Sequence, residues 1–223
     1  MKNRYVRWAL FLLIGVGIGA AIGILDSQNE MSRGVINASP DDQAAAVIKK
    51  PSRKKSDNPA LNVDLGGDFT LINQDGETVT QADFADSYKL VFFGFSYCPS
   101  ICPTELQKIT LVLGDLGDEI ANKITPIFIS VDPERDTPEQ LKQYVVQFNP
   151  RLVGLTGTPE QIEAVTKSFR IYATKVENDM MDEYMMDHSS FSYLTDHNNK
   201  VITLYPSTDT AEEIADDIRA RDL

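Results

Sequence analysis

A nearly continuous apolar run that leads into a pair of cysteines is the strongest constraint on how this chain folds. Residues Tyr88 to Phe95 are almost all apolar or aromatic, as expected of a central strand covered on both faces. Cys98 and Cys102 follow, and Pro103 suits the first turn of a helix in which apolar residues recur from Thr104 to Leu116. The order strand, loop, helix places both cysteines where open α/β sheets have their sites.

Cys98 and Cys102 are the only cysteines of the chain. A helix N-terminus presents unpaired N–H groups and a partial positive charge, which favour a thiolate over a thiol. A structural disulfide would close so short a loop that it would contribute only about 2 kcal/mol. We therefore interpret the pair as functional. Redox exchange through a Cys98–Cys102 disulfide and binding of a soft metal are the two open alternatives.

The first residues of the chain predict a membrane anchor. Residues 8–25 form an uninterrupted apolar segment, about 27 Å long as a helix at about 1.5 Å per residue, and basic residues precede it whereas acidic residues follow. We expect residues 1–7 in the cytoplasm and residues 8–25 as a single transmembrane helix of a bacterial inner membrane, with the remainder facing the periplasm. A cleaved signal peptide is the alternative, but its apolar core is usually shorter.

Composition suggests a flexible tether between the anchor and the folded domain. Residues 26–59 are polar, poor in aromatic residues and interrupted by prolines. A basic block at residues 49–55 is best interpreted as solvated, with contact to anionic lipid as the alternative. The whole chain has 33 acidic and 21 basic residues, and its exported part is strongly acidic. This balance argues against nucleic-acid binding and suits a basic or cationic partner.

Residues 60–223 predict one α/β domain. Thr137-Pro138 and Thr158-Pro159 each combine an N-cap threonine with proline at N1, and Gln140 and Gln161 would complete capping boxes. Strands alternating with helices and ending in a hairpin indicate a thioredoxin-like sandwich with a central mixed sheet. Besides the strand that precedes the cysteines, the expected strands are 69–72, 78–79, 124–131, 172–176, 192–195 and 201–205, and the closing helix is 211–219.

Residues 177–190 break the regular pattern, and a long irregular loop in a compact domain is often functional. This predicted loop would bring His188, just before a strand, to face the loop that carries the cysteines. Two thiolates and one imidazole form a donor set that suits copper, above all Cu(I). His197 is interpreted as a hairpin-turn residue. The four methionines of the loop are interpreted as having no functional role, some filling gaps against the sheet and others exposed by chance, with a role in Cu(I) capture or transfer as the alternative; they are Met180, Met181, Met185 and Met186.

Three segments of the chain resemble the signature blocks of the SCO/SenC family of copper-binding proteins. They are Cys98 to Pro103, Ser130 to Pro138 and Asp187 to Asp196. The resemblance implies a membrane-tethered, thioredoxin-fold metallochaperone that binds copper through Cys98, Cys102 and His188, as Cu(I) with Cu(II) as a further candidate state. It also implies assembly of the dinuclear CuA centre of cytochrome c oxidase, with subunit II or a similar copper-site protein as partner.

The same resemblance places Asp132 to Asp136 near the site, where Asp132 or Asp136 would orient the ligands or the partner. The chain departs from the family pattern at Asp196 to Asn199, which stands where a proline and a turn glycine are usual. This difference alters a hairpin turn and no expected ligand.

The expected protein is not an enzyme, although thiol exchange could accompany copper transfer. The rival hypothesis is a thiol–disulfide oxidoreductase that reduces the copper-site cysteines of the partner, and peroxidase-like chemistry is a weaker third. Against the rival, the spacing is Cys-x-x-x-Cys and no proline stands just before Phe191, where a thioredoxin would keep its cis-proline.

Overall fold

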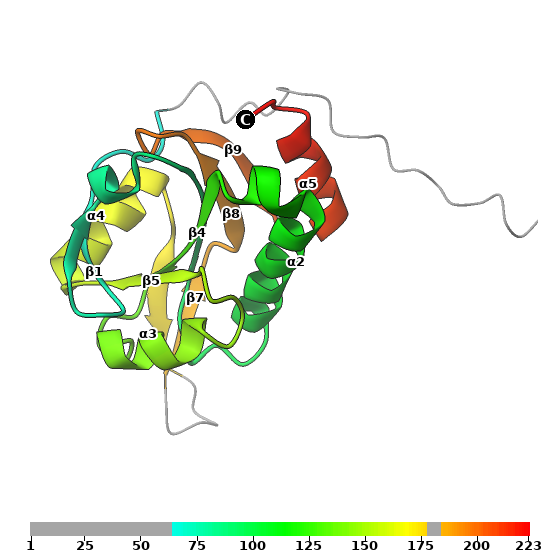
Figure 1. The fold of residues 1–223 in the computed structure, drawn as a ribbon. Coiled ribbons are helices and arrows are strands. Elements are labelled where there is room, and N and C mark those ends of the chain that lie inside the picture. The colour runs from blue at the N-terminus through cyan, green and yellow to red at the C-terminus, as the bar shows by residue number, and fades with distance from the viewer. Residues whose placement is uncertain (1–63, 178–183) are drawn as a thin grey trace, which may run out of the picture. The chain divides into compact units, whose positions relative to one another are not determined.

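A seven-stranded mixed sheet forms the centre of the protein (Figure 1). The computed structural model describes residues 64–177 and 184–223. The strands of this sheet are β1 (Thr70–Asn73), β2 (Thr78–Thr80), β3 (Tyr88–Gly94), β4 (Ile124–Ser130), β5 (Val153–Thr156), β8 (Phe191–Thr195) and β9 (Val201–Pro206). Their spatial order is β2-β1-β5-β4-β3-β8-β9. β3, β4 and β5 are parallel, and the other four strands join antiparallel on the two sides.

Helices cover both faces of the sheet, as Figure 1 shows for α2 and α4. Phe92 and Phe93 are neighbours on β3 and therefore point to opposite faces. The ring centroid of Phe93 lies 5.1 Å from that of Phe169 in α4, whereas Phe92 packs against Phe128, whose ring lies 5.6 Å from that of Tyr144 in α3. The helices are η2 (Gln81–Phe84, 3-10), α2 (Ile101–Ala121), α3 (Pro138–Val145), α4 (Pro159–Phe169) and α5 (Ala211–Arg219).

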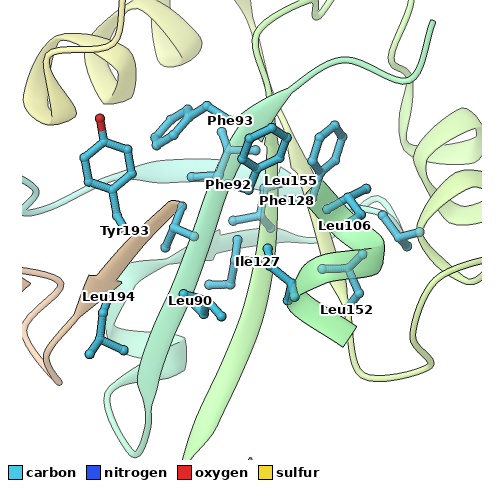
Figure 2. Close-up of a cluster of buried hydrophobic side chains, with 14 of the residues drawn as sticks. Leu90, Phe92, Phe93, Leu106, Ile127, Phe128, Leu152, Leu155, Tyr193 and Leu194 are labelled. Carbon is cyan, nitrogen blue, oxygen red and sulfur yellow. The ribbon is translucent and has the colours of Figure 1, made fainter. Parts of the chain in front are cut away.

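The core lies around β3 and β4, and Figure 2 shows part of it, including Leu90, Phe92 and Phe93 from β3 and Ile127 and Phe128 from β4. Every residue of β3 except Tyr88 is buried, and so is every residue of β4 except Thr125. This confirms the two buried strands that the sequence predicts. The thioredoxin-like α/β arrangement with a mixed sheet is confirmed as well, and it fixes the end of β3 at the edge where the cysteines follow.

The predicted helix starts are confirmed, with one exception in detail. Thr137 and Thr158 are N-caps whose hydroxyls accept hydrogen bonds from the backbone N–H groups of Gln140 and Gln161. The capping box is complete only at Thr158. At Thr137 the prediction is wrong, because the Gln140 side chain instead donates to Ser96 Oγ at 3.1 Å.

Two short strands, β5 and β7 (Met185–His188), were not predicted. β5 pairs with β4 and β1 inside the sheet. β6 (Ala173–Val176) and β7 form a separate two-stranded sheet, here called the ribbon. The prediction of an irregular loop over residues 177–190 is therefore wrong at Met185–His188, because β6 offers these residues an edge with which to pair.

The predicted transmembrane segment at residues 8–25 and the tether at residues 26–59 lie outside the described residues. Across residues 64–177 and 184–223, none of the helices combines the length and the apolar character that a membrane span needs.

Candidate metal centre

The two cysteines stand on different elements at the carboxyl end of β3. Cys98 lies in the cysteine loop, residues 95–100, which begins with a turn in which the Cys98 N–H donates to the Phe95 carbonyl at 3.2 Å. Ser100 is the N-cap of α2, and Cys102 is the second residue of that helix. Pro103 lies in the first turn of α2, as the sequence predicts, but α2 begins at Ile101 and therefore includes Cys102, which the sequence placed in the preceding loop. Cys98 is half-buried and Cys102 is fully buried.

The two cysteines differ in pKa, which is lowered for Cys98 and raised for Cys102. The hydrogen bond with the Cys102 side chain lowers the pKa of Cys98 to about 5, and backbone N–H groups at the start of α2 act in the same direction against the effect of burial. One of these groups, the N–H of Cys102, lies 3.4 Å from Cys98 Sγ. The same contact between the thiols, followed by burial, raises the pKa of Cys102. Cys98 is therefore the thiolate at neutral pH, and Cys102 is the thiol that donates to it.

We expect alkylation of Cys98 in the reduced, metal-free protein to rise with pH through a midpoint near 5, because only the thiolate reacts. Cys102→Ala should move this midpoint upward, since it removes the main cause of the lowered pKa, and Cys102→Ser should move it less because a hydroxyl still donates. Iodoacetamide labelling followed by mass spectrometry measures both. A midpoint near the ordinary thiol value in the unmodified chain would contradict this assignment.

His188 reaches the cysteines from the ribbon. It is the last residue of β7, and its imidazole stands edge-on to the rings of Phe95 and Phe92, with centroid distances of 5.9 Å and 6.3 Å. His188 Nδ1 lies 3.0 Å from the carbonyl oxygen of Ser189. A carbonyl only accepts, so the proton of the neutral ring belongs on Nδ1, and Nε2 keeps a free lone pair.

His188 Nε2 lies 3.7 Å from Cys102 Sγ. Two ligands that bind one metal at about 2.3 Å through sulfur and about 2.0 Å through nitrogen, as in zinc sites, lie about 3.5 to 3.8 Å apart. The structure therefore places His188 next to Cys102, while metal binding by these residues stays a prediction. Across the described ranges, however, no group of three or more His, Cys, Asp or Glu side chains is already arranged to hold a metal ion.

Asp136 supports the start of the cysteine loop. Its buried carboxylate accepts hydrogen bonds from the N–H of Ser96 at 3.0 Å, from Ser96 Oγ at 2.5 Å and from Ser130 Oγ at 2.6 Å. Burial raises the pKa of Asp136, although these three donors oppose the rise. The carboxylate thus binds the loop two residues before Cys98. Asp136 binds the backbone and side chain of Ser96 in the cysteine loop and forms no hydrogen bond with the sulfur atom of Cys98.

Asp132 belongs to a different network. Its carboxylate accepts from Arg135 Nε at 2.6 Å and from the Tyr184 hydroxyl at 2.7 Å. Within the described residues, no hydrogen bond joins Asp132 or Asp136 to a side chain of Cys98, Cys102 or His188. The prediction that Asp132 or Asp136 orients the ligands or the partner therefore stays a prediction; the hydrogen bonds of Asp136 reach the cysteine loop at Ser96, and those of Asp132 reach Tyr184.

Two further predictions concern residues near His188. Met185 and Met186 are partly buried and pack against the core, in agreement with a packing role, while Met180 and Met181 lie outside the described residues. His197 lies in the β8–β9 turn, where its Nδ1 is 2.8 Å from the Ala85 carbonyl oxygen and its ring stands 4.5 Å from that of Tyr88. His197 is thus a turn residue, as predicted.

Sequence reasoning missed Gly94, Ser96 and Tyr184. A Cβ atom on Gly94 would lie 2.8 Å from Cys102 Sγ, so the glycine makes room for the buried thiol. Ser96 directly follows the apolar run Tyr88–Phe95. A serine at the end of a buried strand often forms local hydrogen bonds through its hydroxyl, and this was the signal that could have identified it. Nothing in the local pattern marks Tyr184.

The chain has clear relatives. A family model described as SCO1/SenC matches residues 57–221. An SCO2-like protein of Rickettsia prowazekii is 40% identical over 215 residues, which cover 96% of both chains. The mitochondrial SCO1 homolog 1 of Arabidopsis thaliana is 35% identical over 219 residues, or 98% of this chain, and the chain spans 62% of that relative's length.

Solved structures with the same fold include copper-bound proteins. ScoI of Bradyrhizobium japonicum with copper bound is 42% identical, with a TM-score of 0.63, over 70% of this chain and 98% of that one. Arabidopsis thaliana ScoI with copper bound is 37% identical, with a TM-score of 0.67, over 71% and 99%. BsSco is 28% identical, with a TM-score of 0.56, over 71% and 94%; it is described as having a disulfide switch and as a member of the Sco family of cytochrome c oxidase assembly proteins.

Proposed function

The chain belongs to the SCO1/SenC family, and from that premise we propose that it is a copper metallochaperone whose ligands are Cys98, Cys102 and His188. The observation that carries the proposal is the approach of His188 Nε2 to within 3.7 Å of Cys102 Sγ, with the Cys98 thiolate beside the same thiol. Two thiolates and an imidazole suit Cu(I). Relatives of this chain with copper bound support the choice of metal.

The cargo is delivered by ligand exchange. Cys98 is half-buried, so thiolates of a partner reach the copper from its side, while buried Cys102 and half-buried His188 hold the ion until the exchange is complete. The partner in this proposal is subunit II of cytochrome c oxidase or a similar copper-site protein, which receives copper for its CuA centre. The description of BsSco as a cytochrome c oxidase assembly protein supports that choice.

The location follows from the first residues of the chain. Residues 8–25 anchor the protein in a bacterial inner membrane, residues 1–7 stay in the cytoplasm, and residues 26–59 tether a copper-binding domain of residues 60–223 in the periplasm. The relative in Rickettsia prowazekii covers nearly the same length, which supports a bacterial protein of this organisation.

A thiol–disulfide oxidoreductase is the second candidate function. The observation that favours it is the contrast between Cys98, whose pKa is lowered to about 5, and the buried thiol of Cys102. A solvent-accessible thiolate followed by a buried resolving thiol suits disulfide exchange, and half-buried Cys98 with buried Cys102 has this order. The disulfide switch described for BsSco is consistent with this chemistry.

His188→Ala is expected to weaken Cu(I) binding by at least about tenfold, because it removes one of three ligands while the thiolates remain. The measurement is an anaerobic competition titration of the reduced protein against a strong Cu(I) chelator. His197→Ala is the matched control, since His197 lies in a turn away from the cysteines, and it should bind as the unmodified chain does.

Weak binding by the unmodified chain, or binding indifferent to His188, would favour the oxidoreductase. The reduction potential of the Cys98–Cys102 pair and turnover with an oxidised partner domain would then become the decisive measurements.

A further inference from the structure

Arg135 joins the two parts of the chain that carry the candidate ligands. The centre of its guanidinium group lies 3.8 Å from the ring centroid of Tyr184 and 4.8 Å from that of Tyr97. Tyr184 immediately precedes β7, the strand that ends in His188, and Tyr97 immediately precedes Cys98. One planar cation therefore lies against an aromatic residue directly before the ribbon strand β7 and against another in the cysteine loop.

Hydrogen bonds fix this stack in one geometry. Arg135 Nη1 donates to the carbonyl oxygen of Tyr184 at 3.0 Å, and Nε donates to Asp132 Oδ2 at 2.6 Å. The Tyr184 hydroxyl closes the ring by donating to Asp132 Oδ1 at 2.7 Å. The Asp132 side chain is fully buried and that of Arg135 is 15% exposed. Both the backbone and the ring of Tyr184 are thus held by a buried charge pair.

The segment between β4 and α3, which carries Asp132 and Arg135, also contacts β6, the other strand of the ribbon. Glu134 forms an ion pair with Lys175 of β6, and the Lys175 ammonium group lies 4.7 Å from the ring centroid of Tyr184. Among the described strands, β6 and β7 pair only with each other. These side-chain contacts, together with the short connection from β7 to β8 and the packing of Met185 and Met186 against the core, therefore set where the ribbon lies relative to the sheet.

We propose that Arg135 is a positioning residue, which holds the ribbon against the cysteine loop and thereby sets the distance between His188 and the two cysteines. It touches neither the metal nor a ligand atom. Its effect on copper rests on the proposed function, whereas its effect on the ribbon can be measured without any metal.

Arg135→Gln in the full-length protein is expected to weaken Cu(I) binding by about tenfold, in the range typical of residues that orient metal ligands. Arg135→Lys should behave like Arg135→Gln, because an ammonium group keeps the charge but loses the planar fork. In a His188→Ala background, Arg135→Gln should add less than about a twofold loss, since the imidazole that it positions is gone.

The matched control is Arg221→Gln. Arg221 donates to Asp217 at 2.7 Å, Asp217 also accepts from the Tyr205 hydroxyl at 2.7 Å, and the Arg221 side chain is 11% exposed. This is a second network of an arginine, an aspartate and a tyrosine, with Tyr205 in β9, Asp217 in α5 and Arg221 just after α5, and its hydrogen bonds involve neither the cysteines nor His188. Its loss should leave Cu(I) affinity unchanged.

Hydrogen exchange of the backbone amides of residues 185–188 provides the metal-free readout. In the reduced apoprotein, Arg135→Gln should speed their exchange at least about fivefold, and Arg221→Gln should not. If Arg135→Gln does not fold, Tyr184→Leu removes the stacked ring and should give the same two results. Unchanged exchange at residues 185–188, or an equal loss of affinity with and without His188, would overturn the proposal. Faster exchange in a protein that binds no copper would support the positioning role and reject the proposed function.

Discussion

Cys98→Ser and Cys102→Ser are each expected to weaken Cu(I) binding by at least about a thousandfold, equivalent to about 4 kcal/mol. Cu(I) is a soft ion that prefers thiolate to hydroxyl donors. Cys98 supplies its thiolate already at neutral pH because its pKa is lowered to about 5. Cys102 must lose its proton on binding, and its burial leaves the metal no competing water at that position.

The measurement is the anaerobic chelator competition used for His188, and Ser100→Ala is the matched control. Ser100 stands between the two cysteines as the N-cap of α2, but its side chain makes no capping hydrogen bond. Its replacement should leave the affinity unchanged. Retention of tight binding by either serine variant would show that donors other than this pair hold the copper.

Gly94→Ala is expected to lower the free energy of unfolding by about 3 kcal/mol, at the upper end of what overpacking a core usually costs. The added Cβ would lie 2.8 Å from Cys102 Sγ, 2.9 Å from Phe128 Cε2 and 3.0 Å from Phe92 Cε1. All three neighbours are fully buried, and Gly94 pairs with Ser130 of β4, so neither the side chains nor the backbone can move away easily.

Urea unfolding of the reduced, metal-free protein measures this change, provided that the slope with denaturant stays the same. Gly114→Ala in α2 is the control, because a Cβ there meets no atom within 4 Å; it should raise stability by about 0.5 to 1 kcal/mol through helix propensity. A Gly94→Ala variant as stable as the unmodified chain would contradict this prediction, because it would mean that the Cys102 side chain can adopt another position at little cost.

Elements with strong local signals could be predicted from the sequence. β3 was predicted from its apolar run, and α4 from Thr158, Pro159 and Gln161 together, because these signals act within a few residues. β5 escaped because it is four residues long and contains Gly154. β7 was not predicted because its residues form a strand only by pairing with β6, and no local sequence pattern indicates that pairing.

The candidate site divides in the same way. Cys98, Cys102 and His188 were predicted from donor chemistry and from the order of the elements, and the structure brings His188 to Cys102. The aromatic partners of Arg135 could not be predicted. Tyr97 and Tyr184 are 38 and 49 residues away in the sequence, and their contact with Arg135 depends on tertiary packing alone.

Strand pairing divides the three candidate ligands between two parts of the fold. The cysteines follow from β3 and α2 of the central core, whereas His188 ends a ribbon whose strands pair only with each other in the described structure. Substitutions at the exposed positions of the ribbon can therefore accumulate during evolution with little effect on the folding of the core, while they alter how the imidazole is presented. Natural selection can lengthen or shorten the residence of the cargo by changing one small hairpin and can leave the scaffold as it is.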